Sequence, residues 1–164
     1  MRQILPIVIL LIASFTATAQ DKSTNTSTKG ASSVYGEIGG PGLFSVNYDF
    51  RFQKSQSGLG MRLGLGGIGF LNAGVFTLPV GLNYLSGKDG HYFEAGAGAS
   101  LFSLSDGESV FEANNSTVIG YLSLGYRYQP IKKGFTGRVF LSPLIVPEGG
   151  FFPFYGGISA GFKF

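Results

Sequence analysis

Residues 44–52 read Phe-Ser-Val-Asn-Tyr-Asp-Phe-Arg-Phe and place an apolar side chain at every second position. Successive side chains of a β-strand point to opposite faces. A strand here would therefore have one face made of Phe44, Val46, Tyr48, Phe50 and Phe52. Its other face would consist of Ser45, Asn47, Asp49 and Arg51. Strict alternation over this length predicts a strand between two unlike environments, and the fold depends on which face meets which environment.

Strand-like patterns recur along the chain, whereas helical periodicity does not. We expect eight strands, at about residues 34–40, 43–53, 59–68, 74–85, 91–103, 116–128, 135–145 and 154–164. Three short connections are rich in turn formers and carry lysines: 53–58, 86–90 and 129–134. They alternate along the chain with a second set of connections, which includes the long acidic segment 103–116. In an up-and-down order of strands, the two sets of connections lie at opposite ends of the sheet or barrel. Segment 39–42 (GGPG) fits either a tight hairpin or a kink within one long strand.

The composition of the polar face decides between two β architectures. A soluble sandwich or lipocalin-type barrel would turn its polar face to water, and that face usually carries Lys, Glu and Thr. Here the polar face consists mainly of Gly, Ser and Asn with four arginines, and the lysines of the mature chain lie in the tail, in the turns or at Lys163. Small residues suit the narrow interior of an eight-stranded barrel. We therefore predict an all-β fold, an eight-stranded antiparallel up-and-down transmembrane β-barrel with its apolar face outward.

Arginines inside such a barrel need acidic partners, because an unpaired buried charge is costly. The available strand carboxylates are Asp49, Glu94 and, as a third candidate, Glu37. We predict a structural polar network that plugs the lumen and consists of Asn47, Asp49, Arg51, Arg62, Asn83, Glu94, Arg127 and Arg138. The alternative is four independent arginines on a water-facing surface.

The first residues predict export. Arg2, the apolar stretch 4–15 and the small residues Ala17 and Ala19 form a signal-peptide pattern with cleavage before Gln20. The alternative, a membrane anchor, needs a longer apolar run to cross ~30 Å of hydrocarbon. We divide the chain into a signal peptide (1–19), a flexible polar tail (20–33) and the barrel (34–164). The chain has no cysteine, which excludes disulfides, and its basic residues form no patch that would suit a nucleic acid.

Aromatic side chains concentrate on the outward face near the end with the tight turns, as in the girdle at a membrane interface. The expected members of this girdle are Tyr48, Phe50, Phe52, Tyr84, Tyr92, Phe93, Tyr126, Tyr128, Phe162 and Phe164. A second girdle at the opposite end would use Phe70, Phe76, Phe102, Phe151 and Phe152.

The chain resembles small bacterial outer-membrane β-barrels of the eight-stranded OmpA/OmpX-like class, particularly those of Bacteroidetes-type Gram-negative bacteria. The resemblance rests on the signal ending at residues 17–20 (ATAQ), on 39–42 leading to Asn47-Tyr48, on 78–84 (LPVGLNY) and on the final segment 155–164. It implies integral insertion in the outer membrane, contact with its lipid, and recognition of the C-terminal strand ending at Phe164 by the barrel-assembly machinery. We expect a monomer. The class includes adhesins, structural barrels, small pores and a few lipid-modifying enzymes.

No motif in the sequence predicts catalysis. His91 and Glu94 are three positions apart and would point to opposite faces of a strand, which argues against a triad with Ser100. Asp106, Glu108 and Glu112 lack the spacing of a calcium loop. Residues 64–69 (GLGGIG) fit a dinucleotide motif, but no helix follows to hold a pyrophosphate.

We therefore expect no catalytic, cofactor or metal site. The expected function is a non-catalytic outer-membrane barrel with a structural or surface-interaction role. The alternatives are a small diffusion pore, a lipid-acting outer-membrane enzyme and a soluble lipocalin-like binding barrel.

Overall fold

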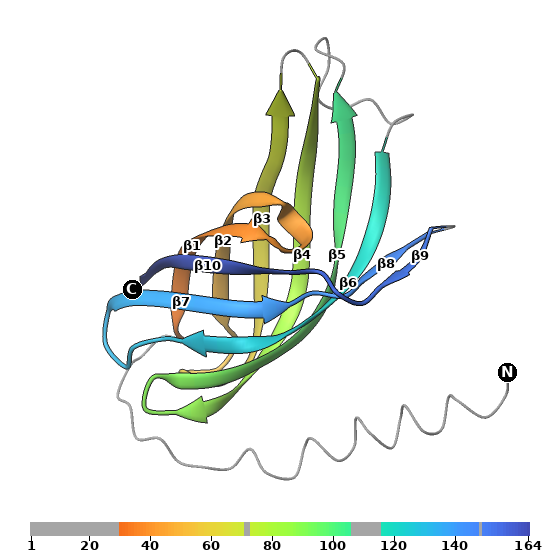
Figure 1. Cartoon of the computed structure of the whole chain (residues 1–164). Coiled ribbons are helices and arrows are strands. Elements are labelled where there is room, and N and C mark those ends of the chain that lie inside the picture. The colour runs from red at the N-terminus through yellow and green to blue at the C-terminus, as the bar shows by residue number, and fades with distance from the viewer. Residues whose placement is uncertain (1–29, 71–72, 106–115, 148) are drawn as a thin grey trace, which may run out of the picture.

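The computed structural model describes residues 30–70, 73–105, 116–147 and 149–164 (Figure 1). The predicted signal peptide and most of the predicted tail lie outside these residues. The described part consists of strands joined by turns and a 3₁₀ turn, η1 (Gly40–Gly42). The strands are β1 (Ser32–Gly39), β2 (Phe44–Arg51), β3 (Gly58–Phe70), β4 (Ala73–Lys88), β5 (His91–Ser105), β6 (Ser116–Tyr128), β7 (Gly134–Leu141), β8 (Leu144–Val146), β9 (Gly150–Phe152) and β10 (Gly156–Lys163).

The strands close into a ring. β1 to β7 pair in sequence order, β10 pairs with both β7 and β1, and every one of these pairs is antiparallel. The predicted closed eight-stranded antiparallel β-barrel is therefore confirmed. No helix among the described residues is long and apolar enough to cross a membrane.

The two ends of the barrel differ. The turn end carries residues 52–57, 89–90 and 129–133, and both termini of the barrel lie there, since the Phe164 amide donates to the Ser32 carbonyl at 3.0 Å. Asp89 and Gly90 both have positive φ, 56° and 92°, as a two-residue hairpin turn requires. The loop end carries η1, the ends of β3, β5 and β8, and the starts of β4, β6 and β9.

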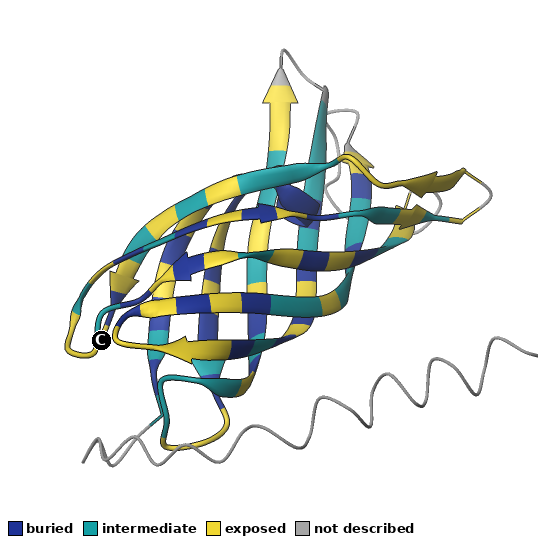
Figure 2. Cartoon of the chain, turned by 60° about the horizontal axis from the view of Figure 1, so that its bottom comes forward, coloured by how far each residue is buried: buried dark blue, intermediate teal, exposed yellow. Residues whose placement is uncertain are grey.

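The alternation of residues 44–52 corresponds to the two faces of the wall (Figure 2). Phe44 and Val46 are 55% and 61% exposed on the outside, whereas Asn47 and Asp49 are each 1% exposed on the inside. The same alternation continues in the other strands, so this barrel has an apolar exterior and a polar core. Three aromatic placements are wrong. Tyr92 is paired with Arg127 and buried, and Phe102 is paired with the buried Thr77, so both face inward. Phe152 is paired with Leu144, which is paired with the buried Tyr121, so it too lies on the inward side.

Three predicted boundaries need correction. β1 begins at Ser32, because Ala31 to Ser33 already pair along β2, so the predicted tail 20–33 is too long. Segment 135–145 is interrupted at residues 142–143, where Pro143 has no amide to donate, but β8 keeps the register of β7 on β6. The predicted connection after β8 contains β9, which pairs with β8.

Segment 39–42 is a hairpin connection that folds into the barrel. β1 and β2 pair from Ser32–Phe50 up to Ile38–Phe44, which excludes a single kinked strand. Gly40, Pro41 and Gly42 are buried, and the Thr77 hydroxyl donates to the Gly42 carbonyl at 2.8 Å. β3 to β6 have 13 to 16 residues, whereas β1, β2, β7 and β10 have 8. The long strands therefore continue past η1, as Figure 1 shows.

Glycines make room for large side chains in the lumen. A Cβ built on any of nine inward glycines would lie closer than 3.0 Å to another part of the barrel; these are Gly60, Gly64, Gly66, Gly81, Gly96, Gly98, Gly125, Gly157 and Gly161. At Gly98 that Cβ would lie 2.6 Å from Cζ of Tyr121. On the outward face, a Cβ on Gly36 would meet its nearest atom only at 4.0 Å. The glycines of the polar face are therefore required by packing.

We predict that Gly98→Ala lowers the free energy of unfolding by about 1–3 kcal/mol, because the methyl group overpacks the lumen against Tyr121. Gly36→Ala, the matched outward substitution, should change it by less than about 0.5 kcal/mol. Urea titration of the folded protein, followed by its gel migration without heating, measures both. Equal losses for the two variants would contradict the packing argument.

Candidate functional site

The eight side chains predicted to form a lumen network all lie inside the barrel. They project from β2, β3, β4, β5, β6 and β7, and each is at most 4% exposed: Asn47, Asp49, Arg51, Arg62, Asn83, Glu94, Arg127 and Arg138. Each faces inward because it lies on the buried one of the two alternating faces of its own strand. Burial of this many charges makes the lumen the candidate functional site.

Seven charged side chains alternate in sign in one chain of ion pairs. Arg51 Nη2 lies 2.5 Å from Asp49, Asp49 lies 3.1 Å from Arg127, and Arg127 lies 3.2 Å from Glu94. Arg138 joins Glu94, at 2.5 Å, to Glu37, and Arg62 ends the chain 3.1 Å from Glu37. We refer to these seven residues as the arginine–carboxylate chain. Each interior member contacts two opposite charges, which compensates for much of its desolvation.

The two asparagines of the predicted network have different hydrogen-bond partners. Asn83 links the chain laterally, because its amide donates to Asp49 at 2.6 Å and to Glu94 at 3.3 Å while its carbonyl accepts from Arg51 at 2.5 Å. Asn47 instead donates to the Ser45 hydroxyl at 2.8 Å. Asn47 is thus in the lumen, and its hydrogen bond to Ser45 is separate from the arginine–carboxylate chain.

Sequence reasoning missed the aromatic part of the lumen. The guanidinium carbon of Arg62 lies 5.4 Å from the ring centre of Tyr121, and that of Arg138 lies 5.2 Å from Tyr35 and 4.1 Å from Phe140. These distances are those of cation–π contacts, which favour a guanidinium out of water. The alternation of side chains along the strand could have predicted this, because Leu122 points outward and its neighbour Tyr121 must therefore point inward.

Polar contacts lie on both sides of the arginine–carboxylate chain along the lumen. At the turn end, Lys163 Nζ donates to the carbonyls of Pro130 and Ile131, each at 2.7 Å, and Gln129 donates to Gln56 at 3.3 Å. At the loop end, the buried turn η1 covers Glu37, since a Cβ on Gly40 would lie 2.8 Å from Oε1 of Glu37. Buried polar contacts and the turn η1 thus flank the arginine–carboxylate chain on both sides.

The charges of the arginine–carboxylate chain do not balance. Four arginines face three carboxylates, so the chain carries one net positive charge when all seven groups are ionised. Loss of a carboxylate raises this excess, whereas loss of a terminal arginine removes it. The two kinds of substitution should therefore have unequal costs.

The residues considered for catalysis are far from a catalytic arrangement. His91 is exposed on the outside, where its Nδ1 lies 2.5 Å from the Tyr126 hydroxyl, whereas Glu94 and Ser100 are buried in the lumen. The glycine motif at 64–69 lies within strand β3. Asp106, Glu108 and Glu112 lie outside the described residues. Within the described ranges, no three acidic or histidine side chains are grouped to hold a metal ion.

The comparisons with known proteins concern the fold. Neither the protein-family models nor the curated proteins searched include a match to this sequence. Among solved structures, a similar one is the crystal structure of the N-terminal β-barrel domain of Pseudomonas aeruginosa OprF. The TM-score is 0.58 at 12% sequence identity, over 84% of this chain and 98% of that domain. The fold is that of an OmpA-like barrel. At this identity the similarity establishes the architecture and leaves the activity to be argued from the site.

We predict that Glu94→Gln lowers the free energy of unfolding by about 3–5 kcal/mol, because it leaves Arg127 and Arg138 short of a buried counter-charge. Arg62→Gln, at the end of the chain, should cost at most about half as much, since Glu37 keeps Arg138. Urea titrations of both variants in the same detergent provide the comparison. A loss for Arg62→Gln that equals or exceeds that for Glu94→Gln would show that charge balance does not govern the lumen.

Proposed function

We propose that this chain is a non-catalytic integral protein of a bacterial outer membrane, with a structural or surface-interaction role and a lumen closed by the arginine–carboxylate chain. One observation carries this proposal. Every exposed charged side chain of the described residues lies at the turn end: Lys54, Lys88, Asp89, Lys132 and Lys133. The rest of the outer wall is apolar, and its exposed side chains include Leu63, Val80, Leu82, Leu122, Leu124 and Val139.

The distribution of outward side chains fits a bilayer better than water. A soluble protein rarely exposes a contiguous apolar patch above a few hundred Å², and this wall is apolar around the ring. A closed barrel also satisfies its backbone hydrogen bonds between strands, as hydrocarbon requires. A soluble lipocalin-like barrel would have the opposite distribution, with its apolar side chains inside.

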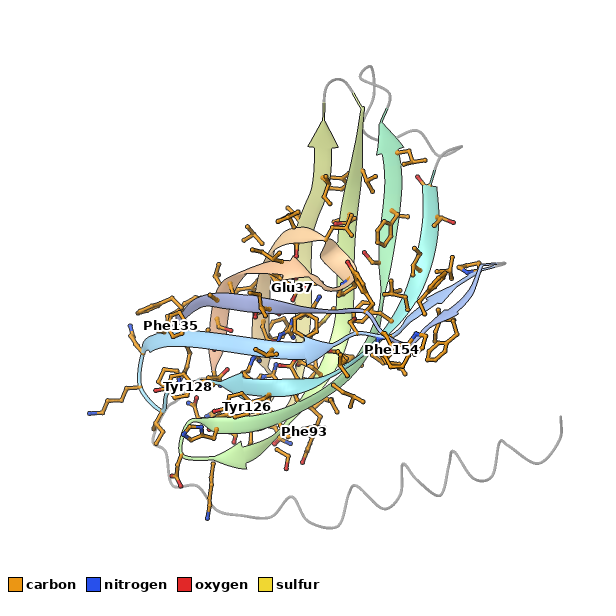
Figure 3. All side chains as sticks on the ribbon, viewed as in Figure 1. Glu37, Phe93, Tyr126, Tyr128, Phe135 and Phe154 are labelled. Atoms are coloured by element: carbon orange, nitrogen blue, oxygen red, sulfur yellow. The ribbon has the colours of Figure 1, made fainter. Side chains whose placement is uncertain are left out.

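Aromatic rings and lysines mark one membrane interface. Phe93, Tyr126, Tyr128 and Phe135 are exposed on the outer wall near the turn end, where Figure 3 labels them. Tyr48 and Phe164 stack there with ring centres 6.3 Å apart. The exposed lysines lie beyond this band, at the level where lipid head groups would be. We place the turn end at the periplasmic surface.

The same proposal includes export and assembly. A cleaved signal peptide, residues 1–19, would deliver the chain, and the barrel-assembly machinery would recognise the final strand. β10 supports this assignment, because it closes the ring between β1 and β7 and is followed directly by the half-exposed Phe164. Outer-membrane lipid is the main partner, and we propose a monomer of the Bacteroidetes-type group.

Membrane insertion is tested by fractionation and gel migration. We expect the expressed protein in the outer-membrane fraction, resistant to carbonate extraction, and a folded band that shifts on boiling. A closed barrel resists unfolding in detergent until heated, which causes this shift. Recovery in the soluble periplasmic fraction without detergent would contradict the membrane assignment.

Closure of the lumen is tested by conductance. We expect the wild-type protein in planar bilayers to give no sustained single-channel current, because charged side chains fill the lumen between η1 and the turns. The variant Arg127→Ala/Arg138→Ala, which removes two links of the chain, should conduct more than the wild type when both are inserted in equal amounts. Sustained wild-type currents would favour the small diffusion pore instead.

A further inference from the structure

The inner face of the barrel changes character at the loop end. Along β5 the inward residues are Glu94, Gly96, Gly98 and Ser100, and they are followed by Phe102 and Leu104. Thr77, whose hydroxyl reaches η1, is paired with Phe102, which fixes the inward direction of that residue. Beyond η1 the inward face is therefore apolar.

Residues of five strands share this apolar inner face. Register places Ile68 and Leu104 on either side of Val75, and Leu144 beside the inward Tyr121. Ile119 is paired with the inward Ser100. We define the inner apolar face as Ile68, Val75, Phe102, Leu104, Ile119 and Leu144. None of the six is buried, and Ile68 and Leu104 are 47% and 54% exposed. No charged side chain belongs to it, and Thr117 is its polar neighbour.

The inner apolar face is open toward the side of the barrel. The β2–β3 ladder ends at Ser45–Gly66, the β1–β10 ladder at Gly39–Gly157, and the β10–β7 ladder at Gly156–Leu141. Beyond these pairs the short wall made of β10, β1 and β2 stops, while β3 and the β8–β9 hairpin continue. Only η1 lies across this part of the described barrel.

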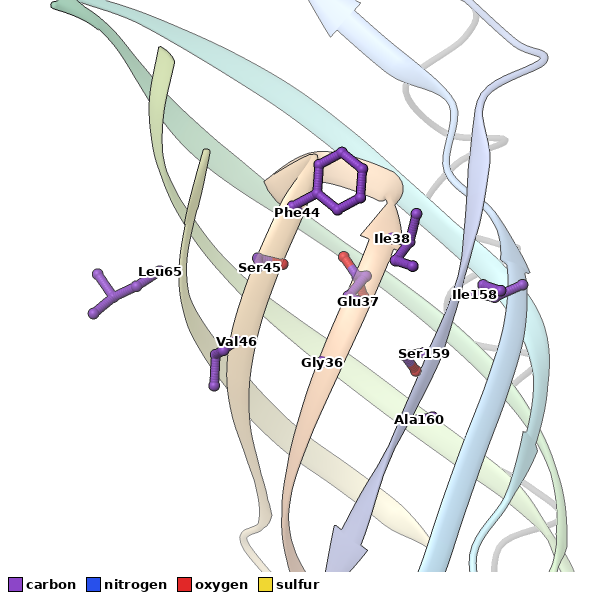
Figure 4. A pocket seen from close by; sticks show the side chains of 10 residues that line it. All are labelled: Gly36, Glu37, Ile38, Phe44, Ser45, Val46, Leu65, Ile158, Ser159 and Ala160. Carbon is purple, nitrogen blue, oxygen red and sulfur yellow. The ribbon is translucent and has the colours of Figure 1, made fainter. Parts of the chain in front are cut away.

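A groove lies on the outside of the wall formed by β10, β1, β2 and β3, and Figure 4 shows the residues that line it. Its volume is about 560 Å³, and its walls are formed by Ile38, Phe44, Val46, Leu65 and Ile158. Its floor is low because Gly36 and Ala160 are paired there. Ile38 and Phe44 are the last pair below η1, so the groove reaches the edge over which the inner apolar face becomes accessible.

We propose that the inner apolar face binds an acyl chain of a membrane lipid, which enters sideways from the groove and over the end of the short wall. The inference rests on the proposed membrane location, because it requires the groove to face lipid. An acyl chain suits the face chemically, since it offers apolar contact and needs no hydrogen-bond partner. The groove is lined mainly by apolar side chains, although the polar residues Glu37, Ser45 and Ser159 also border it.

Photo-crosslinking tests the site at contact range. Phe102 is replaced by p-benzoylphenylalanine, an aromatic for an aromatic, and the protein is folded into vesicles of palmitoyl-oleoyl phosphatidylcholine. We expect irradiation to give an adduct with the mass of one lipid. The same replacement at Leu82, on the outer wall, reports contact with the bulk lipid. The same replacement at Phe140, which faces inward below η1, reports whether lipid enters the lumen. Gel migration before heating confirms that each variant is folded.

The outcomes separate the inference from the proposed function. Lipid adducts at positions 102 and 82 but not at 140 support the acyl-chain site. An adduct at 82 without one at 102, or a protein–protein adduct at 102, overturns it and leaves the membrane barrel intact. Adducts at all three positions indicate lipid throughout the lumen and also overturn it. Absence of an adduct at 82 contradicts the membrane barrel itself.

A charge on the inner apolar face provides a second arm. With the crosslinker at position 102, Leu104→Asp should reduce the lipid adduct by about tenfold or more, because a carboxylate disfavours hydrocarbon. Leu104→Ala, which stays apolar, should retain most of the adduct. Equal adduct yields for the two variants would mean that the lipid does not occupy this face.

Discussion

The structure depends on the pairing of charges inside a narrow ring of strands. An eight-stranded barrel has an interior only just wide enough for side chains, so charged groups placed there must satisfy one another. The alternating order from Arg51 to Arg62 does this, because each interior member contacts two opposite charges. The inward glycines follow from the same constraint, since a Cβ at Gly98 would collide with the Tyr121 ring. Charge pairing and small residues are therefore two parts of one packing solution.

This polar core leaves the exterior free to be apolar. In a water-soluble barrel the side chains that drive folding must face inward, and few arginines could be accommodated there. Here the interior is specified by ion pairs and cation–π contacts, while Val46, Leu82 and Val139 stay on the outer wall. The surrounding solvent then has to supply the apolar environment that the exterior needs. The proposed place of this barrel in a lipid bilayer rests on this inversion more than on any single residue.

Much of the fold was predictable because strand parity is local. The alternation in residues 44–52 assigns faces without knowledge of any partner strand, and the same rule places Arg62, Glu94 and Arg138 inside. Strand alternation does not predict which residues of different strands lie beside one another around the ring. Arg138 donates a hydrogen bond to Glu37, 101 residues away in the sequence, and only the pairing of β1 with β10 brings the two together. The start of β1 could not be predicted either, because Ser32 and Ser33 are small polar residues like those of the tail that precedes them. Tyr92 was assigned outward from its aromatic character, although its pairing with Arg127 turns it inward.

The inward residues of β5 change from small or charged to apolar, so the inside of the barrel has two chemically different parts. Up to Ser100 the inward residues are small or charged, and displacement of the arginines that lie among them would leave carboxylates unpaired. From Phe102 onward the inward residues are apolar and remain partly exposed, although burial of such side chains is ordinarily favourable. A sequence that needed only a closed structural barrel would gain solubility at its outer mouth from polar residues at these positions. Apolar residues on the inner side of the wall, beside a short wall that ends early, fit the proposed site for a hydrocarbon chain. The turn η1 and the arginine–carboxylate chain would then form the floor of that proposed site.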